Sequence, residues 1–226
     1  MSFKVYWVNL PHMTKRASHM RTLLSNCPYD HEHIEAVSPS TMPPYIDGNR
    51  EYPLRPTEYA CTLSHMKALQ ACLQDEHEYA IIVEDDIANI ERIDFDHIVK
   101  SAPDNWECLQ LQTNNLRITL DLYNNHFLKR GTLWMEWDPN HWSTLVYVIH
   151  KERVRDKILQ MTTDFTKFPI RPVADIFVYS SFLTYTTTKP LTTSLDEDSS
   201  IHPEHLAMHS MNTRISNNIM NEQSKK

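Results

Sequence analysis

A run of apolar residues that ends in three consecutive carboxylates constrains this chain more than any other feature. Residues 79–83 read Tyr-Ala-Ile-Ile-Val, and Glu84, Asp85 and Asp86 follow directly. The run predicts a strand buried on both faces, as in the parallel sheets of α/β proteins. Ligands bind at the carboxyl ends of such strands, and adjacent carboxylates need a cation or solvent to offset their mutual repulsion. The triplet therefore predicts either an oxygen-ligand site for Mg²⁺ or Mn²⁺, or an acidic turn that faces water.

The chain is very poor in glycine. Gly48 and Gly131 are the only two glycines among 226 residues. A dinucleotide-binding G-x-G-x-x-G turn and a Walker A loop each need several glycines in one short segment. Any bound nucleotide is therefore expected to be held by strand ends, side chains and metal. The same deficit counts against a sugar nucleotidyltransferase, which would need a glycine-rich phosphate loop near its N-terminus.

Length and composition exclude several classes of protein. A length of 226 residues suits one domain with a sizeable core. The net charge of -7 argues against nucleic acid as a partner. No run approaches the roughly 18 apolar residues of a membrane span, and the first residues lack the pattern of a secretory signal, so a cytoplasmic location is expected. The scattered cysteines, without a C-x-x-C pair, are expected to be reduced: Cys27, Cys61, Cys72 and Cys108.

Hydrophobic periodicity and turn residues predict alternating strands and helices. Residues 114–138 have no firm assignment, although their leucines and isoleucine alternate as in a strand. Residues 1–211 are expected to form one domain, and the polar residues 212–226 a frayed tail. Strands are expected at 3–10, 33–37, 79–83, 106–112 and 145–150, and helices at 15–25, from Thr57 as N-cap to 73, at 95–101 and at 151–161.

Several short segments, taken in order, resemble one known family. The strongest are Glu58-Tyr-Ala-Cys-Thr-Leu-Ser-His65 and Tyr79-Ala-Ile-Ile-Val-Glu-Asp-Asp86; residues 5–10, Arg16, 35–37, 146–149, 172–175 and 198–202 add weaker matches. Together they resemble glycosyltransferase family 25, the group of bacterial lipooligosaccharide galactosyltransferases and collagen galactosyltransferase domains. Thr57 and Pro11 depart from the family's usual glycine and aspartate. The segment between Asp86 and Asp175 aligns poorly, and it would hold the acceptor.

The resemblance implies a GT-A fold, a Rossmann-like α/β/α sandwich with a mostly parallel sheet, that uses a UDP-sugar and Mn²⁺ or Mg²⁺. Glu84, Asp85 and Asp86 would take the role of an Asp-x-Asp motif, because a cation that bridges the diphosphate stabilises the leaving group. Asp86 would contact the metal directly, and Glu84 would bind metal-bound water or the ribose. His202 would be a late metal ligand, or else a surface histidine.

The resemblance also implies an inverting reaction, in which a base takes the proton of the acceptor hydroxyl. Asp175, flanked by apolar residues, is the candidate base; the alternative is a helix N-cap. Asn9 and Arg16 would face the nucleotide at the end of the first strand, although a solvated arginine is the commoner case. The remaining candidates would line the donor side or brace the long loop at 38–56: Glu58, Ser64 and His65.

These expectations together describe a transferase that moves a hexose, galactose or glucose, from a UDP-sugar to a glycan or protein hydroxyl. Three alternatives stay open. One is a carbohydrate-binding protein on a degenerate domain, and another is a sugar nucleotidyltransferase. The third is a metallohydrolase built on His202, His205 and His209. The sequence does not specify an oligomeric state.

Overall fold

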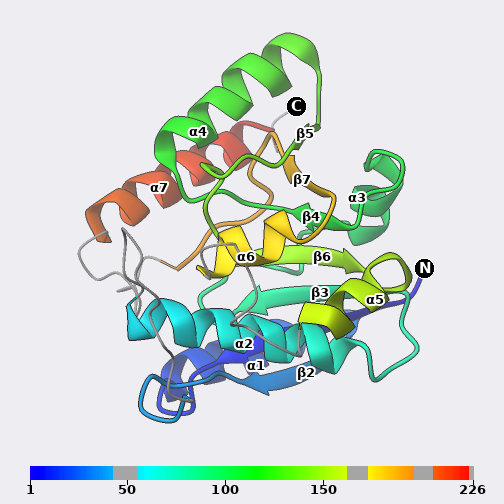
Figure 1. The fold of residues 1–226 in the computed structure, drawn as a ribbon. Helices are drawn as coiled ribbons and strands as arrows, with labels where there is room; N and C mark the ends of the chain where they lie inside the picture. Colours follow the sequence, from blue (N-terminus) through cyan, green and yellow to red (C-terminus); the bar gives the residue numbers. More distant parts are fainter. Residues whose placement is uncertain (43–54, 162–172, 196–205, 224–226) are drawn as a thin grey trace.

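The computed structural model describes residues 1–42, 55–161, 173–195 and 206–223. His202, the expected late metal ligand, lies outside these residues. Seven strands form one sheet (Figure 1). They are β1 (Phe3–Asn9), β2 (Asp30–Glu35), β3 (Tyr79–Glu84), β4 (Cys108–Gln110), β5 (Trp134–Glu136), β6 (Val146–His150) and β7 (Thr184–Thr187).

The sheet is mostly parallel. Its strand order is β2-β1-β3-β6-β4-β7-β5. β1 pairs in parallel with both β2 and β3, and β4 pairs in parallel with β7, whereas β6 and β5 run the other way. The carboxyl ends of β1, β2 and β3 therefore meet at one edge of the sheet, where open α/β sheets bind ligands.

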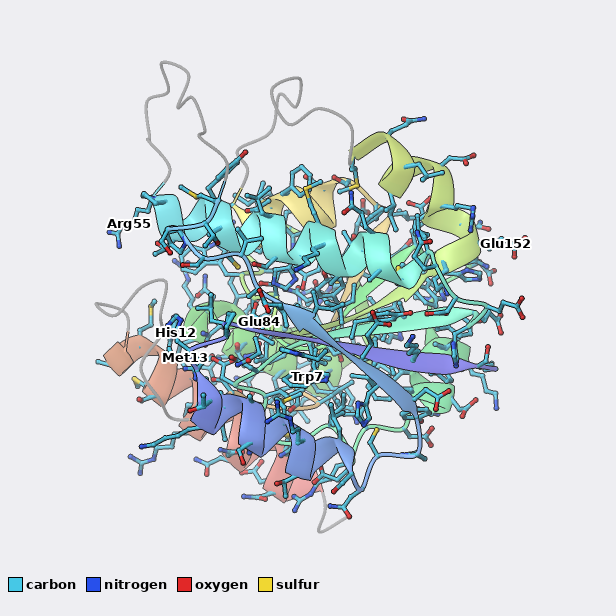
Figure 2. All side chains as sticks on the ribbon, turned by 90° about the horizontal axis from the view of Figure 1, so that it is seen from below. Trp7, His12, Met13, Arg55, Glu84 and Glu152 are labelled. Carbon is cyan, nitrogen blue, oxygen red and sulfur yellow. The ribbon has the colours of Figure 1, made fainter. Side chains whose placement is uncertain are left out.

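Helices cover both faces of the sheet, and Figure 2 shows the strands between α1 and α2. One face packs against α1 (Thr14–Leu24) and α3 (Phe95–Ser101). The other packs against α2 (Pro56–Cys72), α5 (Lys151–Met161) and α6 (Ala174–Ser180). In β3, Ile81 and Val83 join the first core and Ala80 and Ile82 the second, so every residue of the apolar run is buried. The expected α/β/α sandwich is confirmed.

The segment at 114–138 is mainly helical, so the strand suggested by its alternating residues is wrong. It forms α4 (Leu116–Asp121), continues as a π-helix (Leu122–Leu128), and only then reaches β5. The buried side chains of its helical part are Thr119, Leu122 and Tyr123, and the last two lie three and four residues after Thr119. That spacing is the helical period, but one of its three positions is a polar threonine, which conceals it from a hydrophobicity pattern.

The end of the chain is also helical, in contrast to the frayed tail that we expected. Helix α7 spans Leu206–Gln223 and packs against α4. Its inward face contains Asn212, Ser216 and Ile219, again at helical spacing, and two of these three are polar. Among the described residues, no helix combines the length and apolar character needed to cross a bilayer.

Candidate active site

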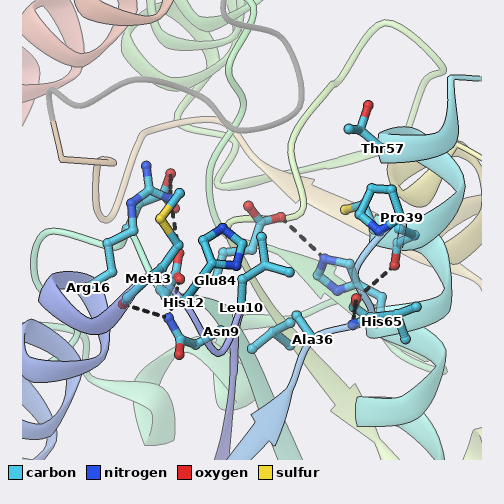
Figure 3. A pocket seen from close by; sticks show the side chains of 17 residues that line it. Asn9, Leu10, His12, Met13, Arg16, Ala36, Pro39, Thr57, His65 and Glu84 are labelled. Atoms are coloured by element: carbon cyan, nitrogen blue, oxygen red, sulfur yellow. Dashed lines mark hydrogen bonds and ion pairs between the residues drawn. The ribbon is translucent and has the colours of Figure 1, made fainter. Parts of the chain in front are cut away.

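A pocket of about 290 Å³ lies where β1, β2 and β3 end (Figure 3). The start of α1 and the first half of α2 complete its wall. Seven of the residues predicted to form the site line this pocket, although they are spread over almost 80 positions of sequence. They are Asn9, Arg16, Ser64, His65, Glu84, Asp85 and Asp86.

Asp85 joins the end of β3 to the junction of β1 and α1. Its Oδ2 accepts a hydrogen bond from Asn9 Nδ2 at 2.6 Å, and its Oδ1 accepts one from Arg16 Nη1 at 3.0 Å. Burial raises the pKa of Asp85, and the bonds from Asn9 and Arg16 counteract part of that rise. Both oxygens of this carboxylate are thus engaged by the protein, which gives Asp85 the geometry of a brace.

Asp86, the next residue, is held differently. Its Oδ1 is buried and has no hydrogen-bond partner among the described residues, while its Oδ2 lies 3.7 Å from Arg16 Nη1. Burial, followed by the charge of Glu84, raises the pKa of Asp86 to about 7. A buried acceptor without a donor is costly, and a cation in the pocket would remove that cost.

Glu84 faces α2. Its Oε1 accepts a hydrogen bond from Thr144 Oγ1 at 2.5 Å and lies 3.3 Å from His65 Nε2 (Figure 3). Burial acts to raise the pKa of Glu84, but the bonds from His65 and Thr144 and the charge of Arg16 bring it below its usual value. The other ring nitrogen of His65, Nδ1, is 3.0 Å from the hydroxyl of Tyr147 on β6. Glu84 is therefore held as a carboxylate, in a fixed orientation.

Two further predicted residues brace α2 and its surroundings. Ser64 Oγ donates to the Ala60 carbonyl at 2.7 Å and accepts from the N–H of Val37, just after β2, at 2.8 Å. Glu58 is buried and accepts from the N–H of Arg55 at 2.8 Å, but it is not among the pocket-lining residues. The predicted N-cap at Thr57 is wrong: Arg55 is the N-cap, because Pro56 takes the first helical position, which proline favours.

Asp175 lies in the first turn of α6, whose N-cap is Val173. Asp175 is therefore not the N-cap residue. Its carboxylate accepts a hydrogen bond from the N–H of Ile176 at 2.8 Å, and the backbone N–H of Ser143 faces it and acts to lower its pKa. Burial raises its pKa, with a smaller rise from the charge of Glu84. Asp175 does not line the pocket, yet it is close enough to Glu84 for the two charges to interact.

A turn at Ser143 and Thr144, which was not predicted from the sequence, links these two carboxylates. Ser143, whose N–H faces Asp175, has φ at +127°, a region that strongly favours glycine. The next residue, Thr144, donates to Glu84. Strained backbone of this kind concentrates at functional sites. Its only sequence signal is its place directly before β6, whose amino end lies beside the carboxyl end of the antiparallel β3.

A family model supports the resemblance noted in the sequence. The model for glycosyltransferase family 25 (LPS biosynthesis protein) matches residues 3–175. The match includes the strand ends of the pocket, the first half of α2, and Asp175. No curated protein matches this chain.

Solved structures similar to this chain include three glycosyltransferases. One is involved in the glycosylation of the major capsid of PBCV-1; it is 12% identical, with 91% of this chain and 89% of that chain covered and a TM-score of 0.45. A mutant Drosophila beta-1,4-galactosyltransferase 7 in complex with manganese, UDP-Gal and xylobiose is 10% identical, with 70% and 52% covered and a TM-score of 0.32. Mouse xyloside xylosyltransferase 1 in its apo form is 14% identical, with 78% and 67% covered and a TM-score of 0.37.

Proposed function

This chain belongs to glycosyltransferase family 25. We propose that it transfers a hexose from a UDP-sugar to a hydroxyl group of a glycan or protein, and that a divalent cation assists the transfer. Galactose or glucose is the proposed sugar. The donor would bind in the pocket at the ends of β1, β2 and β3, with Asn9 and Arg16 on the nucleotide side. Ser64 and His65 would form the opposing wall, on α2.

The observation that carries this proposal is the buried, unpartnered Oδ1 of Asp86 beside the charged Glu84. Carboxylate oxygens at this position fit Mn²⁺ or Mg²⁺, which take oxygen ligands. When bound, the cation would supply positive charge to the diphosphate as the glycosidic bond breaks. Asp86 and Glu84 would hold it, while Asp85 would keep the end of β3 in place through Asn9 and Arg16.

His202 remains a proposed late ligand of the same cation. Its support comes from the chain that precedes it. The N–H of Leu195, the last residue described before that segment, donates to the Asp86 carbonyl at 2.6 Å. The chain thus enters the segment that contains His202 directly beside the predicted metal ligand.

Asp175 is the proposed general base. The acceptor hydroxyl oxygen would attack the anomeric carbon as the bond from that carbon to the UDP oxygen breaks, and the hydroxyl proton would pass to Asp175. A single displacement of this kind inverts the configuration. The raised pKa of Asp175 makes its carboxylate a better proton acceptor than an ordinary exposed aspartate.

The test is a donor screen that measures UDP release from a panel of nucleotide sugars, with and without Mn²⁺. We expect one UDP-hexose to support release that Mn²⁺ stimulates. Asp86→Ala should abolish the stimulated part while its circular dichroism and melting curve show a folded protein. Asp156→Ala, which removes an exposed carboxylate on α5, is the matched control and should behave as wild type.

Two results would count against the proposal. Full Mn²⁺-stimulated turnover by Asp86→Ala would remove Asp86 from the cation site. If the wild type released UDP from no donor and bound UDP without any dependence on Mn²⁺, the alternative of a carbohydrate-binding protein on a degenerate domain would be favoured.

A further inference from the structure

A second group of ligand atoms lies beside the proposed cation site. Cys61 and His65 are four residues apart on α2, so they share one face of the helix, and Glu84 meets them from the end of β3. One ligand atom from each residue lies within 4.8 Å of the other two. All three residues line the pocket. We propose that Cys61, His65 and Glu84 form a binding site for a borderline transition metal, for which Zn²⁺ is the natural probe.

The geometry suits tetrahedral coordination. His65 Nε2 and Glu84 Oε1 are 3.3 Å apart. Zinc bonds of about 2.0–2.1 Å at a tetrahedral angle place two such ligand atoms about 3.3 Å apart. The distance between these two atoms is therefore already that of two ligands on one ion. The open side of the site is the pocket itself, which leaves a fourth position for water or another ligand.

The kinds of ligand atom also distinguish this site from the one at Asp86. A thiolate, an imidazole and a carboxylate together suit Zn²⁺, whereas Mg²⁺ and Mn²⁺ prefer oxygen alone. Burial, and after it the charges of the neighbouring carboxylates, raise the pKa of the Cys61 thiol; the same negative charges favour a cation at this place. They belong to Glu84, Asp175, Asp86 and Glu58. Binding would release the thiol proton and place a thiolate on the metal.

The residues behind these ligands fix their orientation. When a metal binds, Nδ1–H of His65 would donate to the Tyr147 hydroxyl, and Nε2 would give its lone pair to the metal in place of its hydrogen bond to Glu84. Thr144 holds Glu84 Oε1 on the other side. Such outer partners are typical of metal-binding histidines and carboxylates. Because Glu84 also belongs to the proposed Mn²⁺ site, we expect Zn²⁺ to lower the apparent affinity for Mn²⁺; this last step rests on the proposed function.

Cobalt(II) is the direct probe, because a cobalt–thiolate bond gives a charge-transfer absorption that oxygen and nitrogen ligands do not give. The wild-type protein, reduced and stripped of metal, should develop this band on titration with Co²⁺ and lose it when Zn²⁺ is added. Cys61→Ser should abolish the band and weaken Zn²⁺ binding at least tenfold. Cys27→Ser, at a half-buried cysteine outside the pocket, should keep the band. Tyr147→Phe should keep it with roughly tenfold weaker affinity.

Absence of the band in folded wild-type protein would overturn the proposal, as would its persistence in Cys61→Ser. Because the band is read without any sugar donor, it can appear even if no UDP-sugar is turned over. A failure of the transferase proposal and a failure of the zinc proposal are therefore separate results.

Discussion

Two clusters of buried polar side chains in this molecule differ in whether they are complete. One lies between α4 and α7. There Asn212, fully buried, donates to the Thr113 carbonyl at 3.0 Å and accepts from Thr119 Oγ1 at 2.9 Å. Thr113 and Thr119 also bond to each other through their hydroxyls at 2.9 Å. Thr113, Thr119 and Asn212 each have a partner within the protein and none of them carries charge, so these three residues need no ligand.

The other cluster is the pocket, and it is incomplete. Asp85 is fully engaged by Asn9 and Arg16, but Asp86 Oδ1 has no partner among the described residues. Three carboxylates lie at the end of β3, and the guanidinium group of Arg16 contacts two of them, Asp85 and Asp86. Buried polar groups that form hydrogen bonds with one another stabilise the fold. Buried groups that lack a hydrogen-bond donor or a compensating charge indicate that a ligand binds there. We therefore expect substitutions in the pocket to change mainly the activity, and substitutions between α4 and α7 to change mainly the stability.

The largest expected effect is on turnover, at Asp175. Asp175→Asn keeps the shape of the side chain but removes the proton acceptor, so the rate of sugar transfer should fall by about 10²- to 10⁴-fold. Binding of UDP with Mn²⁺, followed by calorimetry, should change little. A variant that transferred sugar at the wild-type rate would show that another group takes the proton.

A substitution in the polar cluster between α4 and α7 should change the stability of the fold and not the transfer rate. Asn212→Ala removes one hydrogen-bond partner of the Thr119 hydroxyl and one of the Thr113 carbonyl, and we expect the free energy of unfolding to fall by about 1–3 kcal/mol. The transfer rate of the folded variant should stay at the wild-type value. Asn218→Ala, at an exposed position of the same helix, is the control and should cost far less in urea denaturation. Equal losses in the two variants would contradict the structural role of Asn212.

The smallest expected effect is a pH dependence at Asp86. Its pKa in the folded protein is about 7, against an ordinary value of 3.8, so between these pH values the folded state binds more protons than the unfolded state. The stability contributed by protonated Asp86 is therefore complete below about pH 4 and lost as the pH rises through 7. Asp86→Asn has no such loss, so its free energy of unfolding should rise relative to that of wild type as the pH increases from 4 to 8.

Urea denaturation with a chelator present, repeated from pH 4 to pH 8, checks this difference. Asp156→Asn, at an exposed position, should follow the wild-type curve throughout. Parallel curves for wild type and Asp86→Asn would mean that Asp86 titrates as an ordinary carboxylate.

The same contrast explains what could be read from the sequence. The pocket was predictable because β1 and β3 contain apolar runs, and parallel strands bring their carboxyl ends, here Asn9 and Glu84, to one edge. The helices α4 and α7 were not, because Thr119, Asn212 and Ser216 occupy core positions with polar side chains. Only the folded chain shows that Thr119 and Asn212 bond to each other. Ser143 was missed for a related reason, since no side-chain pattern reveals a backbone at φ +127°.

The turn at Ser143 and Thr144 has a mechanical consequence. Two covalently joined residues contact the carboxylate of Asp175 on one side and that of Glu84 on the other. The turn therefore connects the two carboxylates by a short stretch of backbone, and a displacement of the turn would move a hydrogen-bond donor of each carboxylate at the same time.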